Sequence, residues 1–151
     1  MDILSKVCPK NTEGFYKEFT RLIEGVNEVS IWFMGQKNFE KAADVLERCF
    51  NLVKDQPYIF VECFLMVRNN QAALWRYVGN LNRALIYLQK AENILVRNQD
   101  LYSGITYLNL ASLYSQMKEY NSVTKAERML RDVQWQPSIT ANERQCKCFR
   151  T

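Results

Sequence analysis

The sequence predicts an all-α fold in which six helices form three antiparallel helical hairpins. Three observations predict this fold. Apolar residues recur at intervals of three and four along most of the 151-residue chain, which is the spacing of a buried helix face. The chain has only five glycines and three prolines, and no two alternating apolar segments are joined by a tight turn. Few residues separate successive apolar segments, and short links make sequential helices antiparallel.

The first hairpin is predicted over residues 15–33 and 39–53. In the first segment, six apolar residues from Phe15 to Phe33 are spaced 4, 3, 4, 3 and 4 apart, which places them on one helix face. The second segment has a similar stripe. Asn38 precedes this segment, and an asparagine side chain there can cap the first helical turn.

The second hairpin is predicted over residues 58–75 and 81–95. Pro57 suits the first turn of the earlier helix, because its fixed φ is already helical. Gly79 is placed to end that helix. Asn80 follows and can cap the next helix, so we expect a short link between the two.

The third hairpin is predicted over residues 101–114 and 120–133, and the second of these stripes is the weaker one. Pro137 closes this last helix, because proline cannot continue a helical hydrogen-bond ladder. Thr140 and Glu143 have the spacing of a capping box. They therefore predict a short additional helix near the C-terminus.

Charge and cysteine usage favour a soluble cytoplasmic protein. Twenty basic and sixteen acidic residues give a formal net charge of +4, spread along the chain rather than clustered as in a nucleic-acid binder. Five cysteines at irregular spacing make a poor disulfide framework, and Cys49 and Cys63 are expected as small core residues in a reducing compartment. The longest apolar stretch, residues 58–67, is too short to span a bilayer.

The sequence offers little for catalysis. It has no histidine, the commonest general base and metal ligand. It has neither a phosphate-binding loop motif nor a dinucleotide-binding glycine motif. Cys146 and Cys148 form one close pair with no second pair nearby, so a zinc site is not expected. We therefore expect no enzyme activity, no metal and no cofactor.

An internal repeat relates the three hairpins. Five sets of positions share the same two offsets, 42 and then 39 residues. In each hairpin a small residue recurs where two helices must approach closely, and a large aromatic follows three positions later. The sets are Phe33, Trp75 and Tyr114; Ser30, Ala72 and Ala111; Phe39, Leu81 and Tyr120; Ala42, Ala84 and Val123; and Cys49, Ala91 and Leu130.

The repeat resembles the tetratricopeptide repeat family over residues 12–134. The middle unit matches best, with small, aromatic, turn and large positions held by Ala72, Trp75, Gly79, Leu81, Ala84, Leu88 and Ala91. The units depart from the family in length, at about 40 residues rather than 34. Lys37 and Lys118 also occupy the turn position that Gly79 fills, and Glu127 stands where an apolar residue is expected.

The resemblance implies a right-handed superhelix of three tetratricopeptide-like hairpins, with units at residues 12–54, 57–97 and 99–134. Residues 1–11 would then form an N-terminal extension. Residues 135–151 would form a C-terminal tail or partial cap that includes the short helix. In such a superhelix, the first helix of each hairpin lines a concave groove.

The resemblance further implies that this groove binds an extended peptide or a helix of a partner protein. The predicted partner-binding residues are Asn27, Ile31, Asn69, Asn70, Ala73, Arg76, Tyr77, Asn109, Ser112 and Gln116. We therefore predict a non-catalytic protein–protein interaction module, an adaptor or scaffold subunit of a larger assembly.

Two alternatives stay open. One is a self-associating module. The other is an RNA-binding helical-repeat protein, since related two-helix arrays bind RNA one base per repeat. Glu24 and Glu28 on the expected inner face count against RNA, because they would repel phosphate.

Overall fold

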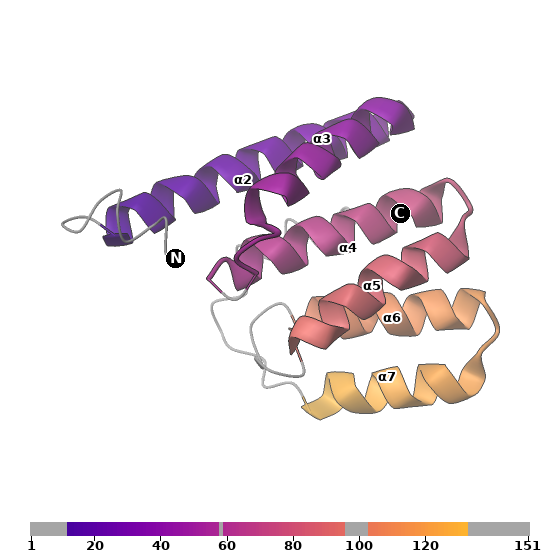
Figure 1. The fold of residues 1–151 in the computed structure, drawn as a ribbon. Coiled ribbons are helices and arrows are strands. Elements are labelled where there is room, and N and C mark those ends of the chain that lie inside the picture. The colour runs from indigo at the N-terminus through magenta and orange to yellow at the C-terminus, as the bar shows by residue number, and fades with distance from the viewer. Residues whose placement is uncertain (1–11, 58, 96–102, 133–151) are drawn as a thin grey trace.

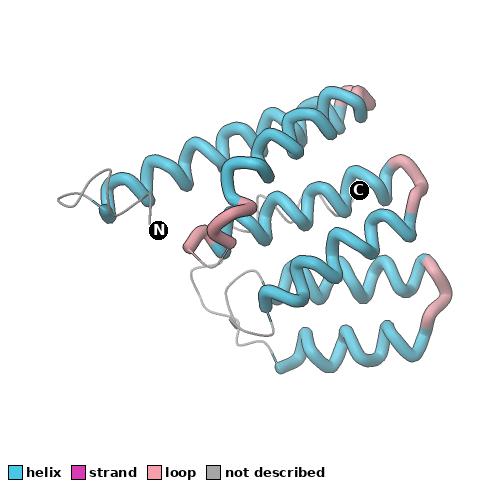
Figure 2. The backbone as a smooth tube through the Cα atoms, viewed as in Figure 1, coloured by secondary structure: helices cyan, strands magenta, loops and turns pink. Residues whose placement is uncertain are grey.

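Six α-helices make up the described part of the chain, and no strand occurs there. The structure is a computed structural model that describes residues 12–57, 59–95 and 103–132. Figure 2 shows the helices joined within each hairpin by short loops. The helices are α2 (Thr12–Gly35), α3 (Phe39–Val53), α4 (Val61–Tyr77), α5 (Leu81–Leu95), α6 (Ser103–Gln116) and α7 (Tyr120–Asp132) (Figure 1). The all-α prediction is confirmed.

The helices pack as three sequential antiparallel pairs, α2 with α3, α4 with α5, and α6 with α7. Consecutive pairs are joined by contacts of α3 with α4 and of α5 with α6. The first helices also touch one another, α2 with α4 and α4 with α6. Helix α4 is therefore the centre of the array, with neighbours on four sides (Figure 1).

The three turns within the pairs share one hydrogen-bond pattern. Lys37, Gly79 and Lys118 each adopt the left-handed conformation, with φ of 58°, 87° and 60°. In each turn the next amide donates to a carbonyl five residues earlier, as in a Schellman helix end. These bonds run from Asn38 to Phe33 (2.9 Å), from Asn80 to Trp75 (2.8 Å) and from Glu119 to Tyr114 (2.9 Å). The turns therefore recur at the two sequence offsets of the repeat.

The predicted caps are confirmed at two helix starts. The side-chain oxygen of Asn38 accepts from the Lys41 amide at 3.3 Å, and that of Asn80 accepts from the Arg83 amide at 3.0 Å. Each satisfies one of the free amides of a first helical turn.

The start of α4 was predicted wrongly. The helix begins at Val61 rather than at residue 58, and Pro57 lies in the preceding turn instead of the first helical turn. The amide of Phe60 donates to the Gln56 carbonyl at 3.2 Å. Its buried ring packs against Phe19, with ring centroids 4.4 Å apart. The ring is therefore buried against α2 in the turn that precedes the helix.

The core follows α4, which is buried almost all round over residues 61–74, apart from the exposed Glu62. Its neighbours contribute fully buried side chains such as Ile23, Leu46, Leu88 and Leu113. No helix among the described residues is long and apolar enough to cross a membrane. The predicted N-terminal extension and C-terminal tail, with the capping box of Thr140, lie outside the described residues.

Candidate functional site

Buried amides join the first helices of the array. The Asn70 side-chain nitrogen on α4 donates to the Asn27 side-chain oxygen on α2 at 2.6 Å. Asn27 is only 1% exposed, and its backbone carbonyl accepts from the Ser30 hydroxyl at 2.6 Å. A buried amide without partners is costly, so this pair favours one relative placement of α2 and α4.

A second set of amides joins α4 to α6. The Asn69 side-chain nitrogen donates to the Thr106 hydroxyl at 2.9 Å and to the Leu65 carbonyl at 2.8 Å. The Asn69 side-chain oxygen accepts from the Asn109 side chain at 2.8 Å. Four predicted partner-binding asparagines, Asn27, Asn69, Asn70 and Asn109, are thus buried and hydrogen-bonded to the protein itself.

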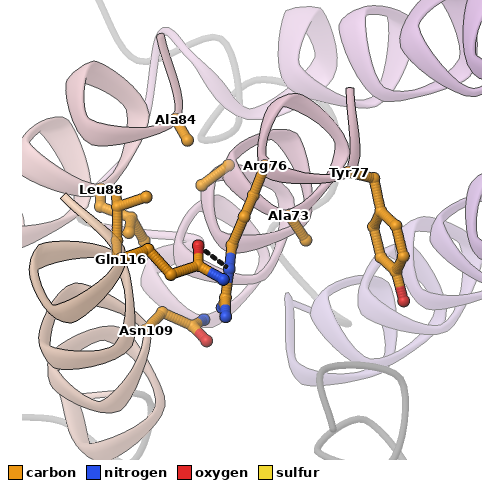
Figure 3. Close-up of a pocket in the computed structure, with 9 residues that line it drawn as sticks. Ala73, Arg76, Tyr77, Ala84, Leu88, Asn109 and Gln116 are labelled. Atoms are coloured by element: carbon orange, nitrogen blue, oxygen red, sulfur yellow. Dashed lines mark hydrogen bonds between the residues drawn. The ribbon is translucent and has the colours of Figure 1, made fainter. Parts of the chain in front are cut away.

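Helices α4, α5 and α6 line a cavity of about 240 Å³ that is open to the surface. Figure 3 shows Ala73 and Arg76 from α4, Ala84 and Leu88 from α5, and Asn109 and Gln116 from α6 around it. The walls are mixed, with small and branched apolar side chains on one hand and polar side chains of α4 and α6 on the other. The lining consists of Ala72, Ala73, Arg76, Tyr77, Ala84, Leu88, Asn109, Leu113 and Gln116. Five of the ten predicted partner-binding residues therefore meet here.

Arg76 extends from α4 to α6 beside this cavity. Its Nε donates to the Gln116 side-chain oxygen at 2.8 Å, and one terminal nitrogen donates to the Ser112 hydroxyl at 2.8 Å. Both acceptors are uncharged, and within the described residues Arg76 forms no ion pair. The guanidinium is half-buried, so a positive charge is held in a fixed direction at the cavity.

Tyr77 is half exposed, and its ring points away from the pair formed by Arg76 and Gln116 (Figure 3). Ile31 lies half-buried on α2 and does not line the cavity. Hydrogen bonds thus place Asn69, Arg76, Asn109, Ser112 and Gln116 where α4 meets α6, and Asn27 and Asn70 where α2 meets α4.

Sequence reasoning missed four residues of the cavity, Ala72, Ala84, Leu88 and Leu113. It restricted the groove to the first helix of each hairpin, whereas two of these residues come from α5. The repeat pattern held a usable signal. Ala84 and Leu88 occupy a small and a large position of the middle unit, and a small residue there leaves room between helices.

A second cation, Arg68, is only 7% exposed. Its guanidinium carbon lies 3.7 Å from the centre of the Phe50 ring and 5.4 Å from those of Phe64 and Tyr87. One terminal nitrogen donates to the Gln71 side chain at 3.0 Å, while Nε is buried without a hydrogen-bond partner among the described residues. Burial lowers the pKa of Arg68. The residue packs α4 against α3 and α5 and was not singled out from the sequence.

The two described cysteines are buried free thiols. Burial, with a smaller effect of Cys63, raises the pKa of the Cys49 thiol from 9.0 to about 11. Burial also raises the pKa of Cys63. Thiols of raised pKa are poor nucleophiles. Among the described residues, no group of three or more histidine, cysteine, aspartate or glutamate side chains is placed to hold a metal.

Comparison with protein-family models, with curated proteins and with solved structures gave no match for the chain.

Proposed function

We propose that the chain is a non-catalytic protein-interaction module of the tetratricopeptide type, acting as an adaptor or scaffold subunit in the cytoplasm. The cavity between α4, α5 and α6 is the observation that carries this proposal, because five of the predicted partner-binding residues line it. The three equivalent turns, at offsets of 42 and 39 residues, support the repeat and the right-handed superhelix it implies.

The cavity suits one anchoring side chain of a partner. Its volume of about 240 Å³ lies below the roughly 300–1,000 Å³ that is usual for small-molecule sites. A pocket of this size, lined by apolar side chains together with an arginine and a tyrosine, has the composition of an interface hot spot. We propose that an apolar side chain of the partner enters between Ala73 and Leu88.

Arg76 and Tyr77 supply the polar contacts of this site. The Arg76 guanidinium has only neutral acceptors, so a carboxylate or backbone carbonyl of the partner gains a charged donor. The exposed Tyr77 ring offers apolar area with a hydroxyl at its end. The buried asparagines would not touch the partner. Their hydrogen bonds between α4 and α6 fix the spacing of the helices that carry Arg76 and Gln116.

The test begins with a display library of random peptides, from which peptides that bind the immobilised protein are selected. The selected peptide is titrated against wild type, Ala73→Leu, Arg76→Ala and Tyr77→Ala. Ala73→Leu fills the cavity, and the other two remove the polar anchors. Truncating an anchor of this kind costs about 2 kcal/mol, or about thirtyfold in Kd.

Lys90→Ala on α5 and Lys125→Ala on α7 serve as matched controls, because both side chains are exposed and neither lines the cavity. Melting curves confirm that each variant folds. If Ala73→Leu, Arg76→Ala and Tyr77→Ala bind the peptide as tightly as wild type does, the proposed binding site is wrong. Salt-sensitive binding of a labelled random-sequence single-stranded RNA, with no selected peptide, would favour the RNA alternative instead.

A further inference from the structure

Helix α2 carries a row of exposed apolar residues on the side that faces away from the other described helices. Phe15, Leu22, Val29 and Trp32 are 40%, 55%, 46% and 59% exposed, so the first three are not part of the buried face that the spacing predicted. The opposite face holds buried residues such as Ile23. The outer α2 stripe, as we call it, consists of these four exposed apolar residues together with Glu18 and Gly25, which lie on the same helix face.

The stripe has the spacing of a helix-pairing seam. Its six positions are separated by 3, 4, 3, 4 and 3 residues, which corresponds to the a and d positions of successive heptads. The 24 residues of α2 extend over about 36 Å at 1.5 Å per residue, long enough for all six positions to face one partner helix. Helix α2 packs against α3 and α4 and lies at one edge of the array (Figure 1).

Gly25 gives an independent indication of a close partner. Glycine in the middle of a helix is unfavourable relative to alanine. A Cβ added at Gly25 would meet no atom within 4 Å, so nothing within the described chain requires a glycine there. Its place in the stripe, between Leu22 and Val29, is where a second helix would approach the α2 backbone most closely.

The charges beside the stripe would pair with those of a second α2 helix in only one of the two possible orientations. Arg21 and Glu28 are both exposed and lie along the same edge of the stripe, one heptad apart. When two α2 helices run antiparallel, Arg21 of each copy lies opposite Glu28 of the other. When they run parallel, the charged edge lies opposite Val26 and Phe33, which carry no charge and are half-buried in their own subunit. The antiparallel arrangement is therefore favoured.

We infer that two copies of this chain dock through the outer α2 stripe, with the α2 helices antiparallel and a two-fold axis between Leu22 and Gly25. In this register Phe15 lies opposite the partner copy's Trp32, and Leu22 lies opposite its Gly25. The Arg21 side chain, now bound to Glu18 at 2.8 Å in an exposed pair, lies between Glu18 and the other copy's Glu28. The contact leaves the cavity beside Arg76 untouched, so it is independent of the proposed peptide site.

The oligomeric state of the full chain tests the inference by sedimentation equilibrium over a range of concentrations. We expect a reversible dimer for wild type. Leu22→Asp or Val29→Asp should raise the dimer dissociation constant at least tenfold. Ile86→Asp is the matched control, because Ile86 is an equally exposed apolar residue on α5. A monomer at every concentration, or a dimer unaffected by the stripe variants, would overturn the proposal.

The orientation has its own test. Arg21→Glu and Glu28→Arg should each weaken the dimer, since each places like charges across the two-fold axis. The double variant Arg21→Glu/Glu28→Arg restores opposite charges and should return the dissociation constant to within about threefold of wild type. Failure of the double variant to recover, with melting temperatures unchanged, would overturn the antiparallel arrangement.

Discussion

The side chains of Asn27 and Asn70, 43 residues apart in sequence, share a buried hydrogen bond of 2.6 Å that joins the first helices of two consecutive pairs. Asn69, the next residue to Asn70, makes the corresponding contact with Asn109 on the other side of α4. Two adjacent residues of α4 therefore set its position relative to α2 on one side and α6 on the other. The register of α2, α4 and α6 therefore depends on buried side-chain amides, which have no access to water and must bond to one another.

We predict that Asn70→Ala lowers the free energy of unfolding by about 1–3 kcal/mol, because it leaves the Asn27 amide buried without its donor. Urea denaturation followed by circular dichroism measures the loss. The double variant Asn27→Ala/Asn70→Ala should lose less than the sum of the two single variants, since the two groups are coupled. Strictly additive losses would show that the bond contributes nothing specific.

The turns at Lys37 and Lys118 give a prediction of the opposite sign. Both residues adopt φ near 60°, which costs a residue with a Cβ about 1–2 kcal/mol and costs glycine almost nothing. Lys118→Gly should therefore stabilise the protein by about 1 kcal/mol, reduced somewhat by the greater freedom of glycine in the unfolded chain.

Gly79→Ala is the matched control for this prediction, because Gly79 has a φ of 87° at the equivalent turn. No side chain would crowd an added Cβ there, so the loss of stability reports backbone strain alone. Thermal melts of both variants measure the effect. A destabilised Lys118→Gly protein would mean that the lysine side chain contributes more than its backbone costs.

These turns also show why much of the fold could be predicted from sequence. Helix periodicity and short links are local properties, and Asn38, Gly79 and Asn80 act within a few residues of their own position. Local chemistry therefore indicated the helix pairs and most of their ends. The start of α4 was missed at a place where Phe60 makes a long-range contact with Phe19, which periodicity and capping residues do not show.

The candidate site was less predictable, for a related reason. Asparagine has the same helical spacing whether it faces a groove or a neighbouring helix, so Asn27 and Asn70 looked like groove residues. The structure places them where α2 meets α4. Helix α4 has neighbours on four sides, so polar residues such as Gln71 are buried off any single apolar stripe. Periodicity describes one face and cannot show this.

The Cys49 thiol predicts how stability responds to high pH. Burial raises the pKa of Cys49 from 9.0 to about 11, so the folded state favours the neutral thiol. Its contribution to stability is complete below the unfolded pKa of 9.0 and is lost as pH rises through about 11. Urea midpoints measured across this interval should fall, and should fall less steeply for Cys49→Ala. Parallel curves for the two proteins would contradict the assignment.

The last prediction concerns Arg68, whose charge is buried among three aromatic rings. Removing a guanidinium from water is costly, and here Nε has no acceptor to compensate. Methionine keeps an unbranched stem and places a polarizable sulfur near the rings. We therefore expect Arg68→Met to leave the free energy of unfolding within about 1 kcal/mol of wild type, or to raise it.

Arg68→Ala provides the contrast. It removes the stem as well as the charge, opens a space beside Phe50 and takes the donor from Gln71, so a loss of about 2–4 kcal/mol is expected. Urea denaturation of the two variants separates packing from charge. If Arg68→Met is as damaging as Arg68→Ala, the guanidinium itself stabilises the core. Its stacking on Phe50, 3.7 Å from the ring centre, would then outweigh the cost of burying it.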